Sequence, residues 1–373
     1  MKKRKDNFSI TQICGLFCAI IFFAVFISAK EKIPGNTFDR QVPFKAVLEI
    51  KETDDSFYFK YPNRVYADDD ENIYVLDYNR LLKFSITGLF MKNLIRSGQG
   101  PGEITSVSNL QIDKNGIVIH NNHPSKIIRL NTNGVLEKEL RLEKSDHIEF
   151  CFYDPNYYYF FESVHFIGDT DGKYIDEEQK LVRVSAEGKN PETIFTFLLK
   201  KYYAQNGGAF GTLDVAARIS AVYDNRYLFL YHTPDYKIKR IDVKENAKSI
   251  EFGIDYKRRE VPKELFDEVH SGLLILNGKK FKKPEQKYLN DIRNLLIYKK
   301  NLWVVTSTVD KAKGTRVDVY DSNGKNTDRF FLKLPNHPDP YSVIWSISGD
   351  YLYSINPAGD QDPTVVKYKI DLN

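Results

Sequence analysis

The sequence predicts an all-β protein, a six-bladed β-propeller with four-stranded blades. Two observations predict this fold. An eight-residue pattern recurs six times along the chain, and a segment near the N-terminus supplies the one strand that the sixth repeat lacks. The composition agrees, because 25 Phe and 24 Tyr residues among 373 favour strands and can fill a large core.

The repeated octad alternates apolar and polar residues, and four of its six copies end in glycine. Glycine suits a turn residue with positive φ, so each copy is expected to be a strand that runs into a turn. The copies are LLKFSITG (81–88), IIRLNTNG (127–134), LVRVSAEG (181–188), IKRIDVKE (238–245), VDVYDSNG (317–324) and VVKYKIDL (365–372).

Three further strands are expected around each octad. A tight polar turn, such as DKNG or SGD, joins an inner strand to a second strand that precedes the octad. A fourth strand follows, such as EKELRL (137–142). The second strands are IYVLD (73–77), IVIHN (117–121), YYYFF (157–161), YLFLY (227–231), LWVVT (302–306) and YLYSI (351–355).

The sixth unit ends just past its third strand, so it lacks an outer strand. The segment FKAVLEI (44–50), ahead of the first complete unit, is expected to supply that strand and close the ring. Closure would also cover an edge that an open sheet leaves exposed. The propeller is therefore expected to span residues 44–373, after a linker at 30–43.

Residues 1–29 have the pattern of an export signal. Four basic residues at positions 2–5 precede an uncharged run at 13–29. The run is long enough either for a signal peptide that is cleaved after Ala29 or for a short signal anchor. Neither Cys14 nor Cys18 follows the small-residue pattern of a lipoprotein site. We expect an exported protein that is periplasmic, or membrane-anchored and facing the periplasm or exterior, with membrane contact only through this segment if it is uncleaved.

The exported part has little net charge and a single cysteine. Of the chain's net charge of +4, residues 1–29 carry +3, which leaves +1 on the remainder and no electrostatic footprint for nucleic acid. Cys151 is the only cysteine after the export segment, so no intramolecular disulfide is expected.

Blade one combines IYVLD with LLKFSITG, and the stretch GQGPGE (98–103) follows it. In these features residues 44–373 resemble six-bladed propellers related to NHL repeats. They resemble in particular exported propellers of Bacteroidota and other Gram-negative bacteria, in which a G-x-G-P-G-E stretch follows an early blade. Many such proteins look like lipoproteins, and this chain departs by lacking the lipidation cysteine. The resemblance implies a fold and an envelope location, and it implies no reaction.

The glycines of GQGPGE lie between two strands and not ahead of a helix. A phosphate-binding loop needs a helix N-terminus, so this chemistry is not expected here. We interpret the stretch as a structural crossover in which Glu103 accepts backbone N–H bonds in the adjacent blade. A ligand-touching loop on the propeller face is the alternative.

Candidate ligands for a metal are few. Asp169, Asp171 and Asp176 occur in a calcium-loop-like order without the full ligand spacing. A solvated insertion is the simpler interpretation, so we expect no cofactor, with a calcium site as the alternative. DDDEN (68–72) aligns with hairpin turns of other blades. His120 and His123 are spaced by three residues, but no acid or cysteine flanks them.

Arg64, Arg218 and Arg293 occur where inner strands begin, in blades one, four and five. If they point into the central channel, they could bind an anionic carboxylate or phosphate. Pairing with an acid of a neighbouring blade is the structural alternative. No catalytic residue can be named.

Two insertions interrupt the repeats, at 197–217 and 255–295. The first is glycine-rich, and the second has helical spacing that starts at Pro262 and again near Pro284. We expect a small helical insertion there, with an apolar face that caps the propeller or docks a partner. The expected face comprises Leu265, Phe266, Val269, Leu273 and Leu274.

Two function classes remain. The first is a non-enzymatic binding or scaffold module of the cell envelope that recognises a protein, peptide or glycan on the face with the long insertions. The second is a lactonase-like propeller hydrolase or lyase with a divalent cation in its channel. Against this class, the sequence has no matched His, Asp or Asn positions across the expected inner strands. The fold alone does not decide between them.

Overall fold

The structure is a computed structural model, which describes residues 40–372 except 53–55, 114, 143–147, 164–172, 216–217, 246–247, 266–272, 283–284, 336, 338, 340 and 357–361. The expected export segment and most of the linker lie outside the described residues. The described chain is nearly all strand, and its helical content is one 3₁₀ turn, η2 (Lys263–Leu265). Among the described residues, no helix has the length and apolar character needed to cross a membrane.

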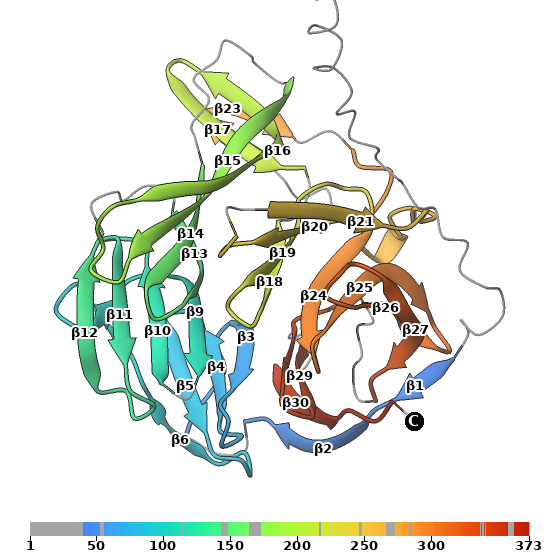
Figure 1. Ribbon diagram of the computed structural model, residues 1–373, viewed down its shortest axis with the longest axis horizontal. Helices are drawn as coiled ribbons and strands as arrows, with labels where there is room; N and C mark the ends of the chain where they lie inside the picture. Colours follow the sequence, from blue (N-terminus) through green and yellow to red (C-terminus); the bar gives the residue numbers. More distant parts are fainter. Residues whose placement is uncertain are drawn as a thin grey trace, which may run out of the picture. The chain divides into compact units, whose positions relative to one another are not determined.

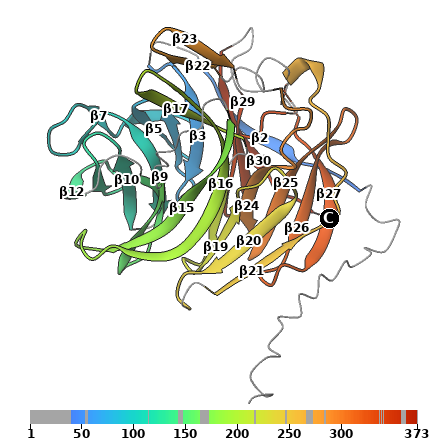
Figure 2. The same ribbon diagram turned by 90° about the horizontal axis from the view of Figure 1, so that it is seen from above.

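Six β-sheets of four or five strands form the six blades, as predicted (Figures 1 and 2). Blade one comprises β3 (Pro62–Ala67), β4 (Ile73–Asp77), β5 (Arg80–Phe84) and β6 (Phe90–Asn93); blade two comprises β9 (Val107–Asp113), β10 (Gly116–Asn121), β11 (Lys126–Leu130) and β12 (Leu136–Arg141). Blade three comprises β13 (Ile148–Tyr153), β14 (Tyr157–Ser163), β15 (Lys173–Ser185), β16 (Glu192–Asn206) and an additional β17 (Ala209–Asp214).

Blade four comprises β18 (Ile219–Tyr223), β19 (Tyr227–Tyr231), β20 (Lys237–Asp242) and β21 (Lys248–Gly253). Blade five comprises β24 (Ile292–Tyr298), β25 (Asn301–Asp310), β26 (Gly314–Tyr320) and β27 (Asn326–Lys333), with β1 (Gln41–Pro43) beside β27; blade six comprises β28 (Trp345–Ser348), β29 (Tyr351–Asn356), β30 (Thr364–Lys369) and β2 (Lys45–Ile50). The six octads supply the third strands β5, β11, β15, β20, β26 and β30.

The N-terminal strand closes the ring, as the sequence predicts. β2 pairs antiparallel with β30, with Ile50 opposite Val365. The preceding β1 pairs parallel with β27 of blade five, with Val42 opposite Leu332, and this pairing was not predicted. Figure 1 shows β1 beside β27 of blade five and β2 beside β30 of blade six. One N-terminal segment therefore ties blades five and six together.

The core lies between blades. Six buried apolar clusters each combine residues of two neighbouring blades, and together they cover all six blade-to-blade contacts of the ring. Between blades five and six, for example, Trp303 of β25 packs in the same cluster as Leu352 of β29 and Tyr368 of β30. Each second strand is buried on both faces, which accounts for its continuous apolar run in the sequence.

The inner strands β3, β9, β13, β18, β24 and β28 each begin a four-stranded meander, so the ring has two distinct faces. We call the face where inner strands begin the entry face; it carries the connections between blades. The exit face carries the turns between first and second strands and between third and fourth strands. Both insertions connect successive blades, so both lie on the entry face.

The expected helical insertion is wrong for the described part of 255–295. Leu265 lies in η2, and Phe266 and Val269 fall outside the described residues. Leu273 and Leu274 belong to β22 (Leu273–Leu276), which forms an antiparallel hairpin with β23 (Lys279–Lys282). Asn277 and Gly278 at its turn have φ of 46° and 79°, as the favoured two-residue hairpin turn requires. The Asn-Gly pair outweighs the helical spacing that precedes it.

Candidate functional site

The four residues predicted to bind a ligand, Arg64, Glu103, Arg218 and Arg293, each contact a different neighbour. Arg64 of β3 donates a hydrogen bond to Oδ1 of Asn109 on β9. Asn109 in turn donates from Nδ2 to the carbonyl of Phe150 on β13, at 2.7 Å. Arg64 therefore begins a polar chain that links the inner strands of blades one, two and three.

Arg218 and Arg293 contact other neighbours. Arg218, just before β18, pairs with Glu149 and Gln179 of blade three and lies over the Phe161 ring, 4.8 Å from its centroid. Burial lowers the pKa of Arg218 to about 10, so its guanidinium stays charged at neutral pH. Arg293 donates to the carbonyl of Tyr341 at 2.7 Å. The anion-binding role of the three arginines stays a prediction, and the contacts shown are between blades.

The GQGPGE stretch is held by hydrogen bonds within itself and to blade two. Glu103 accepts from the Gly100 N–H at 2.9 Å, within its own loop rather than in the adjacent blade as expected. Glu139 of β12 instead makes the contact between blades, because it accepts from the Gly102 N–H at 2.7 Å. At Gly98, where φ is 153°, a Cβ would lie 2.0 Å from Glu103 Oε2. These contacts are those of a structural crossover.

A buried lysine of blade two stabilises this crossover. Lys126 of β11 is 1% exposed and donates to the Gly100 carbonyl at 2.9 Å. The same ammonium lies 3.1 Å from Glu139 Oε2. One lysine thus satisfies both the backbone carbonyl of the loop and the carboxylate that holds the loop's N–H group.

The metal candidates divide between described and undescribed residues. Asp176 is exposed on β15, whereas Asp169 and Asp171 lie outside the described residues. Across the described ranges, no group of three or more His, Cys, Asp or Glu side chains could hold a metal ion. His120 is buried between Ser108 Oγ at 2.5 Å and Ser125 Oγ at 3.3 Å, and burial lowers its pKa to about 4, so it is neutral at pH 7. His123 lies in the turn that follows.

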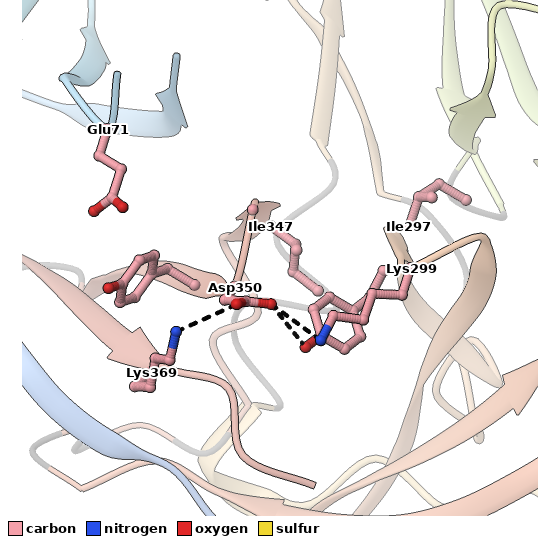
Figure 3. A pocket seen from close by; sticks show the side chains of 9 residues that line it. Glu71, Ile297, Lys299, Ile347, Asp350 and Lys369 are labelled. Atoms are coloured by element: carbon pink, nitrogen blue, oxygen red, sulfur yellow. Dashed lines mark hydrogen bonds and ion pairs between the residues drawn. The ribbon is translucent and has the colours of Figure 1, made fainter. Parts of the chain in front are cut away.

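The exit face has an open pocket of about 610 Å³ over blades five, six and one. Figure 3 shows charged side chains from these separate blades around it. The lining residues are Glu71, Ile297, Tyr298, Lys299, Ile347, Gly349, Asp350, Tyr351 and Lys369. None of them was a predicted site residue.

Asp350 organises the charges of this pocket. Its Oδ1 lies 3.1 Å from Lys299 Nζ and accepts from the Tyr298 hydroxyl at 3.3 Å, while its Oδ2 lies 3.4 Å from Lys369 Nζ. The hydrogen bond from Lys299 lowers the pKa of Asp350, so the carboxyl is ionised at neutral pH. Contacts with Tyr298 and Asp350 raise the pKa of Lys299. The cluster therefore carries two ammonium groups against one carboxylate.

The entry face carries a second feature, which we call the hairpin platform (residues 202–214 and 273–282). The β22–β23 hairpin packs on the β16–β17 hairpin (Figures 1 and 2). A small cluster separates the layers, in which Tyr202, Ala204 and Phe281 are buried and Leu213, Leu274 and Leu276 pack against them. Asn206 Nδ2 donates to the Leu276 carbonyl at 2.9 Å, and Asn277 Nδ2 donates back to the Asn206 carbonyl at 2.7 Å. The two insertions thus fold onto each other.

The outer face of the platform is apolar and basic. Leu273 and Ile275 are 47% and 60% exposed. Lys282 lies opposite Leu273 and Lys280 lies opposite Ile275 across the hairpin, so these four side chains share one face. The sequence signals for the platform were its two turns, Asn206-Gly207-Gly208 and Asn277-Gly278, each flanked by strand-forming residues.

A family model described as 6-bladed beta-propeller (DUF5128) matches residues 39–268, more than half of the chain. The chain belongs to this family. Curated proteins give no match. The relation to NHL repeats and the role of the G-x-G-P-G-E stretch as a family mark stay predictions.

Several solved structures resemble the fold of this member of the 6-bladed beta-propeller family. A Bacteroides fragilis protein described as exported is 14% identical, with a TM-score of 0.52 and coverage of 90% of this chain and 99% of its own. A DUF4221 member from Bacteroides vulgatus is 10% identical, with a TM-score of 0.54 and coverage of 89% and 99%. A Xanthomonas campestris gluconolactonase reaches a TM-score of 0.43 at 9% identity, covering 83% and 87%, which carries no argument about chemistry. These likenesses concern the fold alone.

Proposed function

We propose that this protein is an exported binding module of the cell envelope, which recognises a protein, peptide or glycan through the hairpin platform. The basic and apolar pattern of residues 1–29 supports export. The description of the similar Bacteroides fragilis protein as exported agrees with it. The six blades supply a rigid ring, and the insertions add a surface that the repeats do not require.

The observation that carries the proposal is the outer face of β22–β23. Its neighbouring exposed Leu273 and Ile275 are costly to leave in water, and a partner surface would bury them. Lys280 and Lys282 beside them supply ammonium donors at the same surface. Two inserted hairpins that stabilise each other across a small core hold this face in one orientation.

A crosslinking experiment tests this function. A photoreactive benzoylphenylalanine is placed at position 275 of the full chain in its native envelope, and at Val135 as a control, which is 59% exposed in an exit-face turn. We expect one discrete adduct from position 275 that is absent from position 135 and lost when Lys280 and Lys282 are changed to Glu. Protease or glycosidase digestion of the adduct then identifies the partner class. Equal adducts at both positions, or none, would count against the proposal.

One measurement tests the lactonase-like alternative directly. The full chain is melted after EDTA treatment and again after Ca²⁺, Mg²⁺ or Zn²⁺ is restored. A site filled at a hundred times its Kd adds about 2.7 kcal/mol of stability. A metal-specific rise of that size would favour the hydrolase or lyase, whereas the binding module needs none.

A further inference from the structure

The exit-face pocket lies on the opposite face of the ring from the hairpin platform. Its residues come from the β3–β4 turn, the β24–β25 turn, the β28–β29 turn and the end of β30. Those elements belong to blades five, six and one, and blade one lies beside blade six only because the ring closes. An inference about this pocket therefore goes beyond the proposed function and does not depend on it.

The pocket presents an excess of cationic donors. Lys299 and Lys369 share the single carboxylate of Asp350, and their side chains are 66% and 44% exposed. Each ammonium group has three hydrogen-bond donors. Each of the two lysines contacts only one oxygen of Asp350, so donors remain for a ligand. Glu71 is already balanced by Lys367, whose ammonium pairs with it from β30. One further negative charge would neutralise the Lys299, Lys369 and Asp350 cluster.

The turn that carries Lys299 has lysines at two positions where the backbone favours Asn or Gly. Lys299 and Lys300 have φ of 44° and 71°, the left-handed region in which Asn and Gly are preferred. The equivalent turn of blade four has Asp224 and Asn225 at such angles, and that of blade six has Gly349. A lysine pair with this backbone is unfavourable locally, although Lys299 gains its ion pair with Asp350 across the pocket. Departures of this kind concentrate at functional sites.

The remaining walls select the kind of anion. The carboxylates of Asp350 and Glu71 can accept hydrogen bonds from hydroxyl groups, and the Tyr298 hydroxyl lies among them. Ile297 and Ile347 supply apolar contact from the inner strands. A volume of about 610 Å³ suits a molecule of one or two rings. A purely apolar ligand would remove these charged groups from water without new hydrogen bonds, and a bare anion would make no use of the two isoleucines.

We propose that this pocket binds an acidic saccharide, a mono- or disaccharide with one carboxylate or phosphate group. The acidic group accepts from Lys299 and Lys369, which lie on different blades. The sugar hydroxyls donate to Asp350 and Glu71, and the ring packs beside Ile297 and Ile347. The open pocket faces solvent on the exit side, so a soluble sugar can reach it without any movement of the blades.

Calorimetric titration of the full chain in mild detergent tests the ligand class. The probes are glucuronate, glucose 6-phosphate, neutral glucose and inorganic phosphate. We expect at least one acidic sugar to bind at least tenfold more tightly than glucose, and its identity distinguishes the carboxylate from the phosphate source. If neither acidic sugar binds below about 10 mM, or if glucose binds equally well, the proposal is overturned. Inorganic phosphate binding as tightly as glucose 6-phosphate would overturn the saccharide part.

Variants locate the site. Lys299→Asn and Lys369→Gln should each weaken the acidic sugar about tenfold, because each removes a charged hydrogen-bond donor. Lys300→Gly is the matched control, since it removes a lysine from the same turn but does not line the pocket. It should bind normally. Asn and Gly suit the left-handed positions, so Lys299→Asn and Lys300→Gly should melt no lower than the natural chain. Unchanged affinity in both pocket variants would overturn the assignment, whatever the crosslinking at position 275 shows.

Discussion

Replacing Lys126 by Met should destabilise the propeller strongly. The side chain is 1% exposed and satisfies both the Gly100 carbonyl and the Glu139 carboxylate, which is itself 17% exposed. Removing one partner of a buried ion pair costs about 3–5 kcal/mol, because the other charge is left without compensation. Glu139 keeps its hydrogen bond from the Gly102 N–H and some contact with solvent, so the lower end, about 3 kcal/mol, is expected.

A double-mutant cycle in urea isolates this cause. Lys126→Met with Glu139→Gln removes both charges and retains an oxygen for the Gly102 N–H. The double variant should therefore be at least about 1 kcal/mol more stable than Lys126→Met alone. If Lys126→Met costs less than about 1 kcal/mol, or if the two changes simply add, the buried pair does not hold the GQGPGE crossover and the argument fails.

Two more predictions concern the entry face. Burial raises the pKa of Asp291 to about 6, although Arg258 lies 3.3 Å away. Between about pH 4 and 6 the folded protein therefore binds more protons than the unfolded chain. The free energy of unfolding consequently falls as the pH rises through that window. In urea unfolding at pH 4 and pH 7, the natural chain should lose about 2–3 kcal/mol more than Asp291→Asn, and an equal loss would contradict the assignment. Phe281→Ala should cost about 3–5 kcal/mol within the small core of the hairpin platform, enough to open it locally. Hydrogen exchange should then rise in β17, β22 and β23 but not in β10 or β25, and an even rise through all strands would show that the platform is not a separate unit.

The blades could be predicted from the sequence because each repeats the same local pattern. The second strands are apolar runs buried on both faces, and the octads end in turns whose glycines need positive φ, as at Gly88 and Gly134. The closure by residues 44–50 followed from counting strands. The three-residue β1 was missed because so short a pairing leaves no periodic signal.

The sites could be predicted much less well. The platform was missed because helical spacing after Pro262 was extended across the Asn277-Gly278 turn, which favours a hairpin more strongly than the spacing favours a helix. The pocket was missed for a different reason. Glu71 and Lys369 lie almost at opposite ends of the propeller sequence, and their common site depends on the closed ring and on side-chain directions. Arg64, Arg218 and Arg293 were grouped by a shared position in their blades, yet each contacts a different neighbour.

The pairing of β2 with β30 also bears on how a cell could tell a finished propeller from an unfinished one. β2 is translated before the inner strands of all six blades and β30 after the other propeller strands, so the ring stays open until blade six is made. A chain that stops before residue 364 would leave two unpaired strand edges, and such edges invite aggregation and proteolysis. Closure by an N-terminal strand thus couples resistance to degradation to completion of blade six.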